Sequence, residues 1–79
     1  MRILNDVNDK KIDNISLFLT KDEAFQMIAY LEDLLNNPGK HHAHLSSDDY
    51  QKEITLCVYD QQNINSFHQR AKKLILEDE

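Results

Sequence analysis

The sequence is poor in the residues that break or cross-link a chain. Its 79 residues include one Gly, one Pro, one Cys and no Trp. A single cysteine, Cys57, cannot form a disulfide within the chain, and an unoxidised thiol is typical of a reducing compartment. No stretch has the Gly- and Ser-rich composition of a flexible linker. We therefore expect one domain, covering residues 1–79, in the cytoplasm.

Basic residues are also scarce. Nine Lys and Arg stand against 14 Asp and Glu, so the formal net charge is −5. Proteins that bind a nucleic-acid backbone collect positive charge, and this balance argues against that class. No apolar run approaches the roughly 20 residues of a membrane-spanning helix, and residues 1–6 do not have the pattern of a signal peptide. We expect neither nucleic acid nor membrane as a partner.

The first forty residues show a strand pattern followed by a helix pattern. Apolar residues alternate at Ile15, Leu17 and Leu19, which predicts a half-buried strand. The short apolar piece at residues 2–5 and the polar residues 8–11 predict a hairpin with that strand. Thr20 and Glu23 then have the spacing of a capping box at the start of a helix. The predicted buried face of this helix comprises Ala24, Met27, Ile28, Leu31, Leu34 and Leu35.

Pro38 and Gly39 predict the end of that helix, because Pro cannot continue the hydrogen-bond ladder and Gly permits a left-handed turn. The second half repeats the pattern, with strands predicted at residues 41–45 and 54–58. A second helix follows. The residues that could cap it are Asp60, Asn63 and Asn65, and those it would bury are Ile64, Phe67, Ala71, Leu74 and Ile75.

The order of these elements is ββαββα. We expect an α+β fold, a two-layer sandwich in which two helices cover one face of a four-stranded, mainly antiparallel sheet. The strand order is left open by the sequence. A chain of this length buries little apolar surface, so we also expect a homodimer.

The sheet face without helices is where we expect function. Alternation places a set of chemically distinct side chains on that face: Phe18, His42, His44, Glu53, Cys57 and Tyr59. If the second hairpin pairs His44 with Glu53, then His42 pairs with Thr55. Two exposed aromatic rings on one face indicate a contact surface for a protein.

The histidine-rich stretch at residues 41–44 leaves three interpretations open. His42, His44 and Glu53, with Cys57 nearby, are ligand types that Zn²⁺ accepts. A histidine beside a carboxylate could also act as an acid–base pair in a small hydrolase. Alternatively, the histidines are solvated side chains near a strand end. The sequence contains no established metal or phosphate motif to separate these interpretations.

Three segments resemble parts of small, uncharacterised bacterial proteins, some of which are predicted immunity proteins of polymorphic toxin systems. These segments are residues 19–24, residues 37–45 and the stretch from Glu53 to Asp60. The resemblance implies a protein that neutralises a toxin by binding it, and it supplies no catalytic residues. The leading hypothesis is therefore a non-enzymatic protein-binding module. A metal-binding protein and a small hydrolase are the alternatives.

Overall fold

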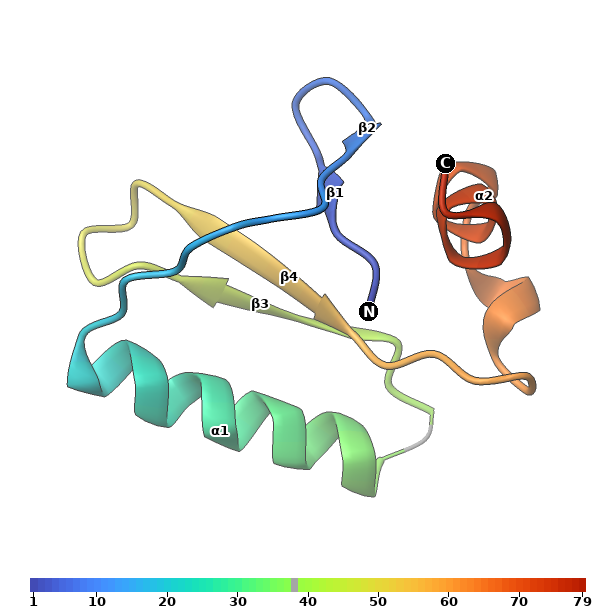
Figure 1. The fold of residues 1–79 in the computed structure, drawn as a ribbon. Helices are drawn as coiled ribbons and strands as arrows, with labels where there is room; N and C mark the ends of the chain where they lie inside the picture. Colours follow the sequence, from blue (N-terminus) through green and yellow to red (C-terminus); the bar gives the residue numbers. More distant parts are fainter. Residues whose placement is uncertain (38) are drawn as a thin grey trace. The chain divides into compact units, whose positions relative to one another are not determined.

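The computed structural model describes residues 1–37 and 39–79, which divide into two compact units. The helix–hairpin unit comprises Phe18–Val58, and the terminal unit comprises Met1–Leu17 with Tyr59–Glu79. The elements follow one another as two strands, a helix, two strands and a helix, with a short 3₁₀ helix before the last (Figure 1). The α+β class and the order of elements are as predicted, and the expectation of one domain stays a prediction.

The described strands form two separate two-stranded antiparallel sheets, and the predicted four-stranded sheet is not observed. In the terminal unit, β1 (Leu4–Asn5) pairs with β2 (Lys10–Lys11). In the helix–hairpin unit, β3 (His42–Ser46) pairs with β4 (Glu53–Cys57). The strand predicted around Ile15, Leu17 and Leu19 is absent, and those three side chains are exposed.

Local hydrogen bonds explain why the first hairpin closes earlier than predicted. The side-chain oxygen of Asn5 accepts from the backbone N–H of Val7, and that of Asn8 accepts from Lys10. Asp9 adopts a left-handed conformation with φ of 59°, and its N–H donates to the carbonyl of Asn5. Asn and Asp tolerate such turns well. The chain has therefore turned back before its alternating apolar residues begin.

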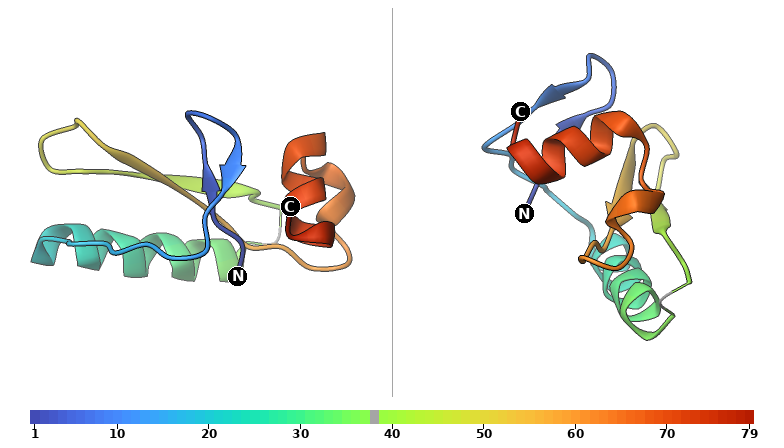
Figure 2. Two further views of the ribbon diagram at one scale, coloured as in Figure 1. Left: turned by 45° about the horizontal axis from the view of Figure 1, so that its top comes forward. Right: turned by 90° about the vertical axis from the view of Figure 1, so that its right-hand side faces the viewer.

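The first helix, α1 (Lys21–Asn36), has the predicted start, and it runs alongside the β3–β4 hairpin (Figure 2). Thr20 and Glu23 form the capping box. The helix ends at the predicted place. The Asn37 side chain donates to the carbonyl and the carboxylate of Asp33, and Gly39 does not adopt a positive φ. Pro38 lies outside the described residues.

The core of the helix–hairpin unit is a single line of contact between α1 and β3. Leu34, Ala43 and Leu45 are buried, and Ile54 and Leu56 of β4 are half-buried. The predicted buried face of α1 is only partly correct, because three of its members are exposed: Ile28, Leu31 and Leu35. Two strands about 4.8 Å apart are narrower than a helix about 10 Å across, so they cannot cover the whole apolar arc of α1.

The second helix begins later than the sequence predicts. Asp60 and Asn63 bond to each other's backbone, and a 3₁₀ helix, η1 (Ile64–Ser66), follows them. Phe67 is extended, so α2 (Gln69–Glu77) starts anew, with His68 as its N-cap. The His68 Nδ1 accepts from the backbone N–H of Ala71. Neither Asp60, Asn63 nor Asn65 caps α2.

Two arginines hold the terminal unit together. Arg2 Nε donates to the carbonyl of Leu74, the buried residue of α2, at 3.0 Å. Arg70 Nε donates to the carbonyl of Asp9 at 2.8 Å. Both bonds join the first residues of the chain to α2. Hydrogen bonds from charged side chains therefore contribute to the tertiary structure of this unit, in which few apolar side chains are buried. Across the described ranges, no helix is both long enough and apolar enough to cross a membrane.

Candidate functional site

The outer face of the β3–β4 hairpin carries most of the predicted site. Alternation along the strands directs Ala43 and Leu45 inward, where they are buried. The other face then holds a row of exposed side chains, which we call the hairpin face: His42, His44, Glu53, Thr55 and Cys57. The predicted division of the hairpin residues between the two faces is therefore observed.

In the predicted register, His44 pairs with Glu53. The observed register of β3 and β4 differs from it by two residues. His42 lies opposite Cys57, His44 opposite Thr55, and Ser46 opposite Glu53. The loop explains the shift, because Ser47 N–H donates to the carbonyl of Lys52 and extends the pairing beyond Ser46. A slip of two residues keeps each side chain on its face, whereas a slip of one would exchange the faces.

His44 is the centre of the contacts on the hairpin face. Its Nδ1 lies 2.6 Å from Glu53 Oε1 and 3.0 Å from Thr55 Oγ1. The ring of His42 meets that of His44 edge-on, with 4.8 Å between the ring centres. His44 is thus held by a diagonal carboxylate, an opposing hydroxyl and a neighbouring ring. These contacts join four side chains of the hairpin face to one another.

A second group of contacts fixes the loop at the end of the hairpin. One oxygen of Glu23 accepts from the N–H of Thr20 and the other from the N–H of Asp48, each at 2.8 Å. Thr20 Oγ1 accepts from the Glu23 N–H and lies 2.7 Å from Asp48 Oδ2, to which it donates. We call these three residues the cap clasp. The N–H groups of Thr20 and Asp48 lower the pKa of Glu23, because they favour its ionised form.

Between α1 and this loop lies a shallow polar hollow of about 270 Å³. Its lining includes His44, Asp48, Tyr30 and Tyr50. Tyr50 is exposed and adopts a left-handed conformation with φ of 58°, which is uncommon for a residue with a bulky side chain. The hollow therefore joins the histidine of the hairpin face to an acid and two phenols.

Neither of the two aromatic residues predicted for the same face belongs to a strand. Phe18 is almost fully exposed, but it belongs to the segment before α1 and to no strand. Tyr59 lies beyond β4, in the terminal unit. The prediction extended the alternation beyond the ends of β3 and β4, where the described strand pairing no longer sets the direction of a side chain, so the placement of these two rings on the hairpin face stays a prediction.

The proposed metal ligands His42, His44 and Glu53 share the hairpin face. Among residues 1–37 and 39–79, however, no three His, Cys, Asp or Glu side chains are grouped as a metal ion requires. Glu53 Oε1 instead contacts the Nδ1 of His44. The described contacts thus correspond to a histidine–carboxylate pair.

Sequence reasoning did not find two features of the helix–hairpin unit. The bond from Asp48 to Glu23 joins residues 25 positions apart, and the sequence carries no signal for it. The second feature is the exposed apolar side of α1, and the sequence does indicate it. Its apolar residues span an arc too wide for one contact line, and Phe25 lies beside that arc.

No protein-family model, curated protein or solved structure matches this chain.

Proposed function

We propose that this chain is a non-enzymatic binding module that holds a second protein against its hairpin face. The observation that carries the proposal is the network at His44, whose ring contacts Glu53 and Thr55 on an exposed surface. A contact surface that is ordered before binding loses less conformational freedom when its partner docks. The two histidine rings of the hairpin face offer both apolar area and hydrogen bonds.

The charge of the chain suggests the chemistry of the partner. The formal net charge is −5, and Glu53, Asp48 and Asp49 lie on or beside the hairpin. Opposite charge steers two proteins together and speeds their association. A basic protein surface is therefore the expected partner, and the resemblance to immunity proteins supports a toxin as one such protein. The single exposed Cys57, in no disulfide, supports action in the cytosol.

A photo-crosslinking amino acid tests which surface the partner contacts. We would place it at Thr55, on the hairpin face, and for comparison at Ala29, an exposed position of α1. After irradiation in an extract of the source cells, we expect one protein other than this chain to be captured at position 55 and not at position 29. Equal capture at both positions, or none at position 55, would contradict the proposal.

The partner captured in this way then allows a quantitative test. We expect His44→Ala to weaken its binding at least about tenfold, because central contact residues commonly contribute more than about 1.4 kcal/mol. Lys73→Ala, at an exposed position of α2, is the matched control and should leave the affinity unchanged. Calorimetric titration at two salt concentrations measures both effects. For a basic partner, we expect tighter binding at the lower salt concentration, where charges are screened less.

A small hydrolase is the second candidate, favoured by the 2.6 Å contact of His44 with Glu53 beside a polar hollow. A carboxylate that accepts from one ring nitrogen of a histidine orients the ring and leaves the other nitrogen as the acceptor. In this case the purified chain should hydrolyse an activated ester or phosphodiester, such as p-nitrophenyl acetate or bis(p-nitrophenyl) phosphate. His44→Ala should then reduce turnover by about 10²-fold or more. A wild-type chain that gives only the buffer rate excludes this candidate for those substrates.

A further inference from the structure

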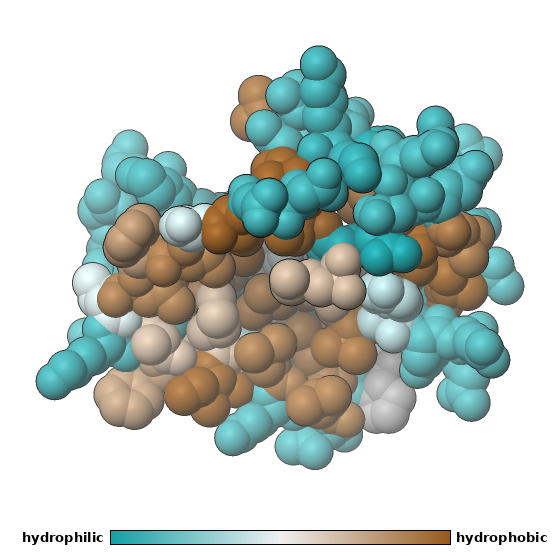
Figure 3. Space-filling model, in the orientation of Figure 1, coloured by the Kyte–Doolittle hydropathy of each residue, from teal (hydrophilic) through white to brown (hydrophobic). Residues whose placement is uncertain are grey.

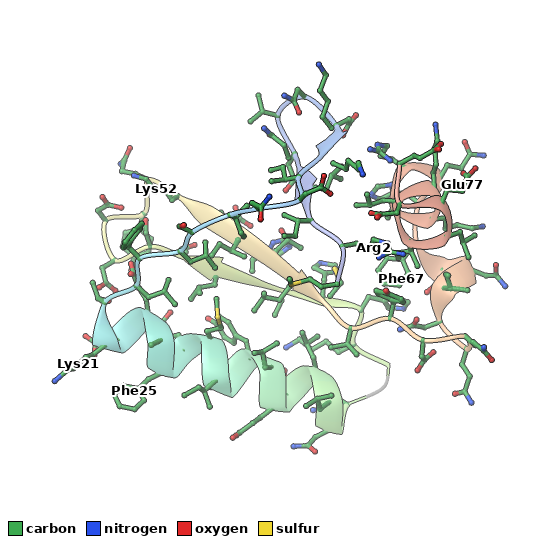
Figure 4. The ribbon with its side chains drawn as sticks, viewed as in Figure 1. Arg2, Lys21, Phe25, Lys52, Phe67 and Glu77 are labelled. Atoms are coloured by element: carbon green, nitrogen blue, oxygen red, sulfur yellow. The ribbon has the colours of Figure 1, made fainter. Side chains whose placement is uncertain are left out.

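Helix α1 carries an exposed apolar stripe that the hairpin does not cover. Its large members are Phe25, Ile28 and Leu35, whose exposed fractions are 67%, 53% and 68%, and Leu31 is exposed as well. Figure 4 shows the ring of Phe25 pointing away from the hairpin. In Figure 3, apolar side chains gather over the region of α1. Contiguous exposed apolar surface on a soluble domain commonly marks an interface.

The spacing of this stripe is that of a helix that pairs with another helix. Five residues follow one another at intervals of three, four, three and four along α1, of which the first is charged and the other four are apolar: Lys21, Ala24, Ile28, Leu31 and Leu35. Alternate steps of three and four keep a seam facing one partner over two heptads. Phe25 and Glu32 lie beside the seam, on its same side. The seam is thus about 21 Å long, since Lys21 and Leu35 are 14 positions apart and each position advances the helix by about 1.5 Å.

The charges at the two ends of the stripe identify the partner. Lys21 lies at its first turn and Glu32 in its last two turns. If a second α1 packs antiparallel, with Ile28 on the two-fold axis, Lys21 of each copy comes within one turn of Glu32 of the other. A parallel pair would instead place Lys21 beside Lys21 and Glu32 beside Glu32, and would align the two helix dipoles unfavourably.

We infer that two copies of this chain associate through the α1 stripe, with their helices antiparallel and Ile28 at the centre. The interface is separate from the hairpin face, so each copy keeps its proposed partner site. The second copy also covers apolar surface that the two strands are too narrow to bury. The inference therefore explains how a unit with so small a core shields the rest of its apolar helix.

Sedimentation equilibrium of the full chain, from about 1 μM to about 1 mM, measures this association. We expect a reversible dimer. Ile28→Asp should raise its dissociation constant at least about tenfold, because two carboxylates would meet on the axis. Ala29→Asp adds the same charge one position away, outside the seam, and should leave the dissociation constant within about twofold. Far-UV circular dichroism verifies that each variant retains its helices.

A charge exchange tests the antiparallel direction. Lys21→Glu and Glu32→Lys should each weaken the dimer, and the double variant should restore it to within about threefold of the wild type. A chain that remains monomeric at every concentration overturns the inference and leaves the stripe to a different protein. A dimer that tolerates Ile28→Asp as well as it tolerates Ala29→Asp overturns the interface. Failure of the double variant to recover association overturns the antiparallel direction.

Discussion

Leu45→Ala should lower the free energy of unfolding by about 2–5 kcal/mol, the usual cost of truncating a fully buried leucine. Leu45 lies on the inward face of β3 and is 2% exposed. Its side chain belongs to the contact line between α1 and the hairpin. Truncation removes apolar burial, and it leaves a cavity that a two-stranded sheet cannot close by rearranging neighbouring strands.

This loss is large compared with the total free energy of unfolding expected for the chain. At about 0.05–0.15 kcal/mol per residue, a chain of this length is stable by roughly 4–12 kcal/mol. Urea unfolding followed by circular dichroism, at a concentration where the protein is monomeric, measures the loss. In the lower part of that range, Leu45→Ala would be partly unfolded even without denaturant.

Leu76→Ala is the matched control, since it removes the same atoms from a side chain of α2 that is 67% exposed. We expect it to change the free energy of unfolding by no more than about 0.5 kcal/mol. If the two variants were equally stable, the contact line between α1 and β3 would not be the core of the helix–hairpin unit.

The features predicted correctly from the sequence are those encoded within a few residues. Thr20 and Glu23 are three positions apart, and each side chain bonds to the other's backbone, so the start of α1 can be read directly. The alternation around Ala43 and Leu45 assigns the faces of β3 in the same way. These signals need no knowledge of what lies across the fold.

The features that the sequence did not predict depend on distant pairing. Ile15 and Leu17 alternate as a strand would, but a strand also needs a partner for its backbone hydrogen bonds. The turn at Asp9 pairs β2 with β1 first and ends that ladder before Ile15. The exposed state of Ile28 follows in turn, because the sheet beneath α1 has two strands and not four.

The candidate site likewise combines features that are encoded locally with features that depend on distant pairing. The sequence placed His44 and Glu53 on one face, and the structure brings them into contact along a diagonal. Pairing of His44 with Thr55 was missed, because the register depends on how Ser47 closes the loop. Exposed positions outside the ladder, such as Phe18, could not be assigned at all by alternation.

Glu23→Gln should destabilise the chain at neutral pH and flatten the acid side of its stability profile. The two carboxylate oxygens of Glu23 accept from the N–H groups of Thr20 and Asp48. A glutamine side chain has one acceptor oxygen and one NH₂ group, so one of these two N–H donors would lose its acceptor. Because this carboxylate is buried, water cannot readily replace it.

The sign of the pH effect follows from the lowered pKa of Glu23. The N–H groups of Thr20 and Asp48 hold this pKa below its ordinary value of 4.5 in the folded chain. The folded state thus binds the ionised form more strongly than the unfolded state does. The resulting stabilisation is present above pH 4.5 and is lost as the pH falls through the folded-state pKa.

Wild-type stability should therefore fall steeply on the acid side of pH 4.5, and that of Glu23→Gln less steeply. Part of the decline should remain in the variant. Lys40 lowers the pKa of Asp33, and the Ser47 hydroxyl lowers that of Asp49, so both carboxyls lose stabilising contacts in acid as well. Urea midpoints measured from about pH 7 to about pH 3 give the two profiles.

Asp22→Asn is the control for this experiment, because Asp22 is an exposed acid in the same first turn of α1. It should leave the shape of the acid profile close to that of the wild type. If Glu23→Gln matched the wild type in both midpoint and pH dependence, the cap clasp would not join α1 to the loop in solution. A flattened profile would instead show that one carboxylate links the start of the helix to the end of the hairpin, beside the hollow that His44 lines.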